Sequence, residues 1–189
     1  MRGEFFILTA LLLLIAISSI YKLLISSNVL YLNELKTGTI FSIMDNVLSE
    51  CELAFQMKCP SECEELPYLL MSFLSRVGDD LETSALFLLA VKNQTRLNLT
   101  IGNALDAAIE VRLESKDNVT IFLHPNSLKS TNLTASAELK ISYDYLGERR
   151  EDSLNLSRIE HGAMLFIDVK IGYGKSFVRE KRIFMKALT

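Results

Sequence analysis

Cysteine is the residue type in this sequence whose spacing most directly suggests chemistry. Three cysteines fall within the segment CELAFQMKCPSEC. A zinc site needs a fourth ligand, but His124 and His161 are far away in the sequence, and CxxxC is not the spacing of a zinc knuckle. In an oxidising compartment such a group forms one disulfide bond with one cysteine left over. We therefore expect a disulfide bond among Cys51, Cys59 and Cys63, without metal; reduced cysteines and a metal site are the alternatives.

A second chemical signal is the asparagine of N-x-S/T sequons, the acceptor of N-linked glycans. Five of the ten asparagines lie in sequons, whereas roughly one or two would do so by chance. All five follow residue 92, so they cluster in the C-terminal half of the chain. The clustering predicts an exported, glycosylated domain; the alternative is that Asn and Thr are simply good solvent-facing residues of a β protein. The predicted acceptors are Asn93, Asn98, Asn118, Asn132 and Asn155.

The alternation around the sequons supports their exposure. Alternate side chains of a β-strand share one face. In LNLTI, therefore, Leu97, Leu99 and Ile101 point one way while Asn98 and Thr100 point the other. NVTIFL and LNLS repeat this pattern. We expect the asparagines of these segments on polar strand faces, where a glycan has room.

Catalytic and nucleic-acid-binding patterns are missing from the sequence. It contains no GxSxG, HExxH, P-loop, GxGxxG or DxDxDG motif, and its titratable residues suggest no converging group. The net charge of −3 gives no electrostatic argument for nucleic acid. We therefore expect a non-enzymatic protein with no catalytic residues, no cofactor and no nucleic-acid partner.

The elements that position these residues begin with a long apolar segment. Residues 5–25 are apolar at all but four positions, and at about 1.5 Å per residue they can cross a bilayer as a helix. Tyr21 would lie at the membrane interface, with Lys22 extending its ammonium group to water. We assign residues 1–27 to a leader and a transmembrane helix.

The next part of the chain, residues 28–83, has the periodicity of helices. Apolar residues recur every three or four positions in 41–55 and again in 66–81, on either side of the turn 59–63. We expect two antiparallel helices forming a neck, with Cys51 bonded to Cys59 or Cys63. The apolar residues are Phe41, Met44, Leu48, Cys51 and Phe55 in the first helix, and Leu66, Leu69, Leu70, Phe73, Leu74, Val77 and Leu81 in the second.

From about residue 84 the period changes to two, which is typical of strands. Short apolar or alternating segments are separated by turn signals such as Gly172-Tyr173-Gly174, across which we expect a hairpin. Residues 84–189 therefore read as an extracellular antiparallel β-sandwich, Ig-like or pilin-like, of seven or eight strands. The predicted fold class is α+β: a transmembrane helix, a helical hairpin neck and this sandwich.

The N-terminal segment has a further possible fate, which is removal. The start Met-Arg, the apolar core and Ala16-Ile17-Ser18 fit a secretory signal cut near Ser18. However, the apolar run continues through Ile25, beyond that cut. Retention of the helix is therefore the favoured interpretation.

The stretch MRGEFFILTALLLL resembles the class III signal of archaeal type IV pilin-like proteins: a short basic leader ending in glycine, then a polar residue and an apolar helix. The resemblance covers about the first 25 residues and implies cleavage after Gly3, with Arg2 and Glu4 flanking the cut. Glu4 replaces the commoner glutamine, and Leu8 stands where bacterial pilins carry a glutamate. In that family the released helix remains in the membrane or packs in a filament core. The implied assembly residues are Phe5, Phe6, Leu8, Leu11, Leu12, Leu13 and Leu14.

Together these features predict a single-span surface protein, a pilin-like subunit of an archaeal filament or adhesion structure. Its N-terminus would lie inside the cell and its C-terminal domain outside. The membrane and further copies of the chain would be its partners. The alternatives are a monomeric membrane-anchored domain that binds a ligand or supports an envelope complex, and a secreted protein cut near Ser18.

Overall fold

The computed structural model describes residues 38–59, 62–77, 81–145, 148–157, 159, 161–173 and 176–187. Within them, residues 38–58 are helical, and a second helix, α2, spans Leu66–Val77. The nine strands of the described residues are β1 (Glu82–Asn93), β2 (Arg96–Ala104), β3 (Ile109–Glu114), β4 (Asn118–Leu123), β5 (Ser127–Thr134), β6 (Glu138–Tyr145), β7 (Glu148–Asn155), β8 (His161–Tyr173) and β9 (Ser176–Ala187).

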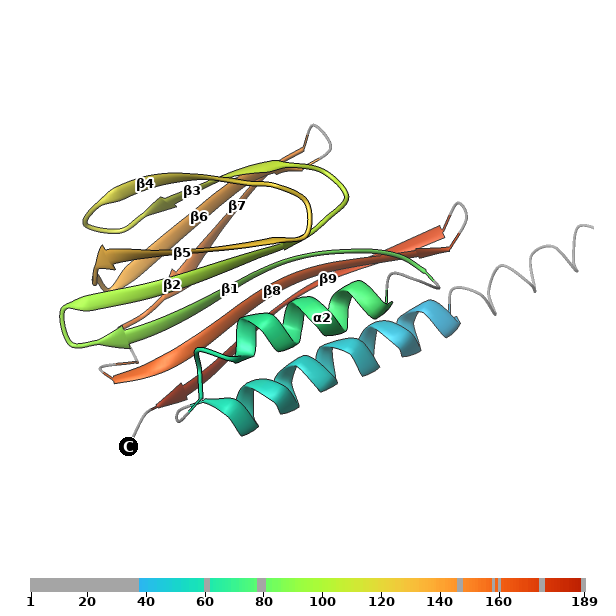
Figure 1. Ribbon diagram of the computed structural model, residues 1–189, viewed down its shortest axis with the longest axis horizontal. Helices are drawn as coiled ribbons and strands as arrows, with labels where there is room; N and C mark the ends of the chain where they lie inside the picture. Colours follow the sequence, from blue (N-terminus) through green and yellow to red (C-terminus); the bar gives the residue numbers. More distant parts are fainter. Residues whose placement is uncertain are drawn as a thin grey trace, which may run out of the picture.

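The strands form two antiparallel sheets that face each other (Figure 1). The larger sheet has the order β5-β2-β1-β8-β9 and the smaller one has the order β4-β3-β6-β7. The hairpin predicted at Gly172–Gly174 is confirmed, because β8 and β9 pair along their length up to Tyr173 and Ser176. β5 is a strand that the sequence did not predict. Only Leu133 of its eight residues is buried, so its apolar pattern is too weak to recognise.

The first hydrophobic core lies between the two sheets. Leu88 and Leu99 contribute to it from the larger sheet, and Val111 and Ile141 contribute from the smaller one. β3 shows the alternation that produces such a core, because every second residue is buried and the others are exposed. The predicted β-sandwich is therefore present.

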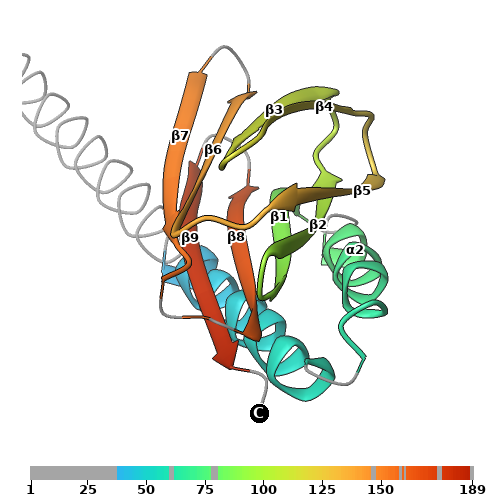
Figure 2. The same ribbon diagram turned by 90° about the vertical axis from the view of Figure 1, so that its left-hand side faces the viewer.

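A second core lies on the opposite face of the larger sheet, which the helices cover (Figures 1 and 2). Met44 and Leu48 of the first helix and Leu70 of α2 pack with Phe87 of β1 and Ile167 of β8 in one buried cluster. Because β1 is covered on both faces, its residues Ala85–Ala90 are all buried. Its uninterrupted apolar sequence follows from this double cover.

The predicted fold class is wrong. The described chain is mostly antiparallel β, and its two short helices form a layer on the sandwich instead of a neck leading to it. Phe55 packs near Phe184 of β9 with ring centroids 6.5 Å apart, and Asp45 pairs with Arg182. The amphipathic stripe correctly marked a buried face, but its spacing contained no information about the surface that buries it.

The predicted transmembrane helix, residues 5–25, lies outside the described residues, as do the leader and the first part of the predicted neck. Among the described residues, no helix has both the length and the apolarity that crossing a membrane requires.

Candidate functional site

The predicted processing residues and assembly residues all lie within residues 1–37, outside the part of the chain that the structure describes. They are Arg2, Gly3 and Glu4 for processing, and Phe5, Phe6, Leu8, Leu11, Leu12, Leu13 and Leu14 for assembly. Their roles stay predictions.

All five sequon asparagines are exposed at the surface of the sandwich. Asn93 ends β1, Asn118 begins β4 and Asn155 ends β7, so these three lie at strand termini. Asn98 and Asn132 lie within β2 and β5. Every predicted acceptor amide therefore reaches solvent in the folded chain.

Asn98 and Asn132 occupy directly opposite positions on two neighbouring strands. The register pairs them, and it also pairs Thr100 with Ser130 two residues along. The hydroxyl groups of Thr100 and Ser130 lie 2.9 Å apart in a hydrogen bond. Since Leu99 belongs to the core between the sheets, these polar side chains face the other way, on the helix side of the larger sheet. We call Asn98, Thr100, Ser130 and Asn132 the polar stripe.

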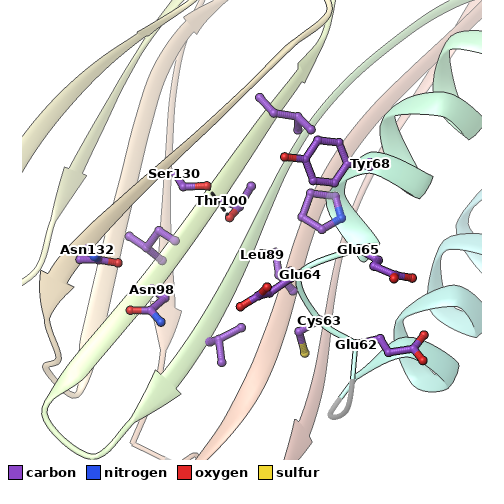
Figure 3. Close-up of a pocket in the computed structure, with 14 residues that line it drawn as sticks. Glu62, Cys63, Glu64, Glu65, Tyr68, Leu89, Asn98, Thr100, Ser130 and Asn132 are labelled. Atoms are coloured by element: carbon purple, nitrogen blue, oxygen red, sulfur yellow. Dashed lines mark hydrogen bonds between the residues drawn. The ribbon is translucent and has the colours of Figure 1, made fainter.

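The polar stripe forms one wall of a groove of about 770 Å³ (Figure 3). The other wall is the turn before α2 together with the start of that helix, and it includes Glu64, Pro67 and Tyr68. Leu89 and Leu128 contribute apolar surface between the two walls. The groove therefore combines an apolar floor with polar walls, so a ligand in it would meet both apolar surface and hydrogen-bonding groups.

Tyr68 is the aromatic residue of this groove. Its side chain is 70% exposed although it lies on a helix that packs against the sheet. Figure 3 shows its ring on the side of the groove opposite Asn98 and Asn132. An exposed aromatic ring beside a groove provides a flat surface on which a ligand can stack.

The carboxylates of the groove are only partly balanced by cations. Lys58 contacts Glu62 and lies 3.1 Å from Glu65. The hydrogen bond to Glu62, followed by that to Glu65, raises the pKa of Lys58. The groove as a whole offers hydrogen-bond acceptors, and it would repel an anionic ligand.

The predicted disulfide bond is present, and it joins Cys59 to Cys63. The two Cα atoms are 4.8 Å apart, within the range that a disulfide bond spans. The bond closes the turn that leads into α2 and therefore restrains the wall of the groove to which Cys63 belongs.

The predicted pairing of Cys51 with Cys59 or Cys63 is wrong, because Cys51 is a free, buried thiol. Cys51 lies eight residues before Cys59, in the helix 38–58. That separation corresponds to about 12 Å along a helix, which is too far for a disulfide bond. Burial, with a smaller contribution from Glu50, raises the pKa of the Cys51 thiol to about 12.

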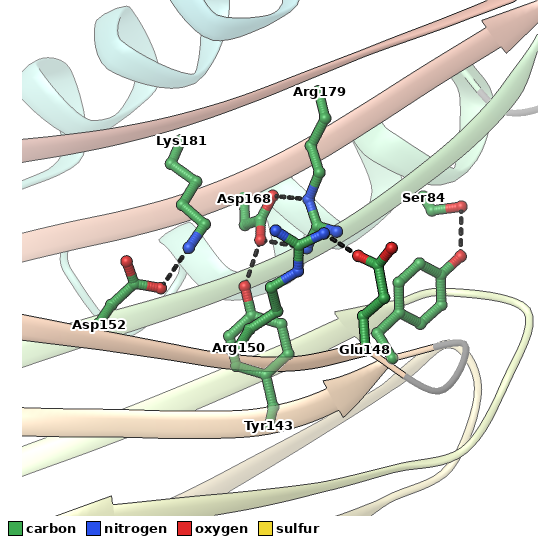
Figure 4. A network of polar contacts seen from close by, with 9 residues as sticks. Ser84, Tyr143, Glu148, Arg150, Asp152, Asp168, Arg179 and Lys181 are labelled. Atoms are coloured by element: carbon green, nitrogen blue, oxygen red, sulfur yellow. Dashed lines mark hydrogen bonds and ion pairs between the residues drawn. The ribbon is translucent and has the colours of Figure 1, made fainter.

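A buried polar network joins the two sheets near β7 and β9 (Figure 4). Asp168 of β8 is only 2% exposed. It accepts a hydrogen bond from the Tyr143 hydroxyl, and Arg179 Nε donates to its Oδ1 at 2.7 Å. Asp152 and Lys181 form a second bridge between the sheets at 2.6 Å.

Contacts within this network fix the protonation states of Tyr143 and Arg179. Burial, together with the hydrogen bond to Asp168, raises the pKa of Tyr143, so its hydroxyl keeps its proton. The hydrogen bond to Asp168 raises the pKa of Arg179, which keeps the guanidinium charged. A permanent cation, its carboxylate and a protonated phenol form a cross-link between the sheets, and the cavity beside them holds only about 10 Å³. Nothing larger than a water molecule fits there.

The described residues contain no group of three or more His, Cys, Asp or Glu side chains that could hold a metal ion.

Sequence reasoning missed the groove because its two walls come from segments far apart in the chain. The pairing of Asn98 with Asn132 depends on the unpredicted strand β5, and Tyr68 was one residue of an amphipathic helix. Asp168 was also missed, although its carboxylate interrupts the apolar run AMLFIDVKI and is a recognisable signal of a buried charge.

The sequence matches no protein-family model, and no curated protein is significantly similar to it.

Proposed function

We propose that the chain is a non-enzymatic cell-surface protein, anchored by a single membrane-spanning helix over residues 5–25, with its sandwich outside the cell. The observation that carries this proposal is the exposure of all five sequon asparagines on the folded domain. A solvent-facing β protein can place a few asparagines this way. Five complete sequons, all accessible, are better explained by glycan attachment during export.

The disulfide bond supports the same location. Disulfide bonds form and persist in oxidising compartments and are rare in a reducing cytosol. The Cys59–Cys63 bond has formed in the folded chain, and both of its cysteines are buried. An extracellular domain protects such a bond through the redox state of its surroundings.

Within this class we propose a pilin-like subunit as the role of the chain. The argument rests on the resemblance of MRGEFFILTALLLL to class III signals, in which cleavage after Gly3 frees the helix. Copies of the chain would then associate through the apolar residues that follow, from Phe5 onward. The membrane is the other partner, and no nucleic acid is involved.

A monomeric membrane-anchored binding domain is the second candidate. The observation that favours it is the groove of about 770 Å³ with the exposed Tyr68 on one wall. This candidate predicts an intact leader in the membrane fraction and no filaments.

Replacement of Gly3 tests the pilin-like role. Gly3→Leu should block removal of the leader and, with it, recovery of the protein in sheared filament preparations. Asn46→Gln, a change at an exposed position of the first described helix, is the control and should leave both unchanged. Unchanged processing and assembly in Gly3→Leu, or absence of the wild-type protein from filaments, would contradict the role.

A further inference from the structure

Two of the five predicted acceptors, Asn98 and Asn132, line the same groove. Asn98 and Asn132 are exposed and directly paired across β2 and β5, and both line the groove with Tyr68. The other three acceptors end β1, begin β4 and end β7, and none of them lines this groove. A sugar joined to either Asn98 or Asn132 therefore starts inside a concave site.

The walls of the groove have the chemistry that binds sugars. One face of a pyranose ring presents C–H groups, which pack favourably on the electron-rich face of an aromatic ring such as that of Tyr68. Its hydroxyl groups need acceptors. The carboxylate of Glu64 supplies one on the same wall as Tyr68, and the hydroxyls of Thr100 and Ser130 supply others on the opposite wall. Val91 and Leu128, both partly buried, add apolar surface below.

The size of the groove fits a short carbohydrate. Ligand sites typically have volumes of about 300–1,000 Å³, and this groove lies in that range at about 770 Å³. Directly opposed side chains on neighbouring strands begin only about 5 Å apart. One attached glycan therefore occupies the space in front of both asparagines.

We propose that this groove holds the first sugars of an N-linked glycan carried by Asn98 or Asn132, with a pyranose ring packed on Tyr68. The proposal rests on the glycosylation included in the proposed function. Attachment joins the side-chain amide nitrogen to C1 of the sugar, breaks the bond from C1 to the phosphate of an activated donor, and releases one amide proton. The bound glycan then covers the polar stripe and links β2 and β5 to the start of α2.

Thermal unfolding of the full chain in detergent, purified from a host that glycosylates it, tests this contact. Peptide mass spectrometry first records which acceptors carry glycan. Tyr68→Ser is then compared with Leu69→Ser, the neighbouring residue, which is exposed but does not line the groove. Both changes are made in the wild type and in the Asn98→Gln/Asn132→Gln background.

We expect Tyr68→Ser to lower the unfolding midpoint of the glycosylated protein by about 3 °C more than it lowers that of the double-Gln background. Leu69→Ser should have equal effects in both backgrounds. We also expect a glycosidase to trim the groove glycan more slowly than the glycan on Asn118. Tyr68→Ser should remove that difference.

The failures of the two proposals are distinguishable. Equal effects of Tyr68→Ser in both backgrounds, with glycan present at Asn98 or Asn132, overturn the groove contact and leave the proposed function intact. Glycan on other acceptors but on neither Asn98 nor Asn132 likewise overturns the groove contact and leaves the proposed function intact. An absence of glycan from all five acceptors overturns this inference together with the glycosylation in the proposed function.

Discussion

At the scale of single residues, Asp168 is a buried polar link between the two sheets. It lies in β8 but faces the smaller sheet, where Tyr143 donates to it, and it also binds Arg179 of the neighbouring strand β9. A buried carboxylate is tolerated only when it is paired and hydrogen-bonded, and Asp168 meets both conditions. Removal of its charge leaves the side chain of Arg179, which is 18% exposed, without its main partner.

Asp168→Asn should therefore lower the free energy of unfolding by about 3 kcal/mol, because one member of a buried ion pair is lost while the other stays charged. Urea unfolding of the full chain in detergent measures this change. Asp144→Asn is the control: Asp144 lies on the same sheet as Tyr143 but is exposed, and its replacement should change stability by less than about 0.5 kcal/mol. Equal effects of the two substitutions would refute the role of the network.

Cys51 gives a second prediction at the residue scale. Its thiol pKa is raised from 9.0 to about 12 by burial, so at pH 8 the reactive thiolate is ~1,000-fold scarcer in the folded chain than in the unfolded chain. Iodoacetamide should therefore alkylate Cys51 at pH 8 in denaturing urea but not measurably in buffer over the same time.

The raised pKa of Cys51 also makes the stability of the folded chain depend on pH. The folded state favours the neutral thiol, so its stabilising contribution is complete below pH 9.0 and is lost as the pH rises towards about 12. The cysteines of the Cys59–Cys63 disulfide are an internal control, because they react only after reduction. Rapid alkylation of Cys51 in the folded chain at pH 8 would show that the thiol is accessible.

At the scale of elements, the helical layer is the feature on which sequence and structure differ most. The stripe from Phe41 to Phe55 predicted a helix with a buried face, and that face is indeed buried at Met44, Leu48 and Phe55. Phe41, a member of the same predicted stripe, is 53% exposed. Periodicity identifies the helix, whereas the covering sheet determines which members of the stripe are buried.

Phe55→Ala should lower the free energy of unfolding by about 4 kcal/mol, because it leaves a cavity between the helix and β9. Phe41→Ala removes the same atoms from an exposed position and should cost less than about 1 kcal/mol. Denaturant unfolding of both variants distinguishes a helix layer that stabilises the sandwich from a separate neck. Similar small losses in both variants would favour the neck.

The strands show what local sequence can and cannot predict. Alternation in NVTIFL, which forms β4, predicted its buried face, because one side of the strand contacts the core and the other contacts solvent. β5 has little such contrast and is held by its pairing with β2, a contact between distant parts of the chain. The groove depends on that pairing, so it could not be predicted from the sequence.

At the scale of the whole molecule, the described part of the chain has three layers: the helices, a five-stranded sheet and a four-stranded sheet. The exposure of Asn98, Asn118 and Asn155 was predicted from alternation, because each lies opposite the apolar residues of its segment. The partners in the disulfide bond were not predicted correctly, because they depend on how far the helix 38–58 carries Cys51 from the turn. The proposed surface location accounts for the exposed acceptors, the disulfide bond and the apolar N-terminal segment together.

The mass of the mature protein in the membrane fraction tests that surface location most directly. We predict a chain that begins at Glu4, retains residues 5–25 and carries glycan on at least one of the five acceptors. Peptide sequencing of the N-terminus and glycopeptide mass spectrometry report all three properties on one sample. A mature chain that begins after Ser18, found in the medium, or a membrane-bound chain without glycan would contradict the account.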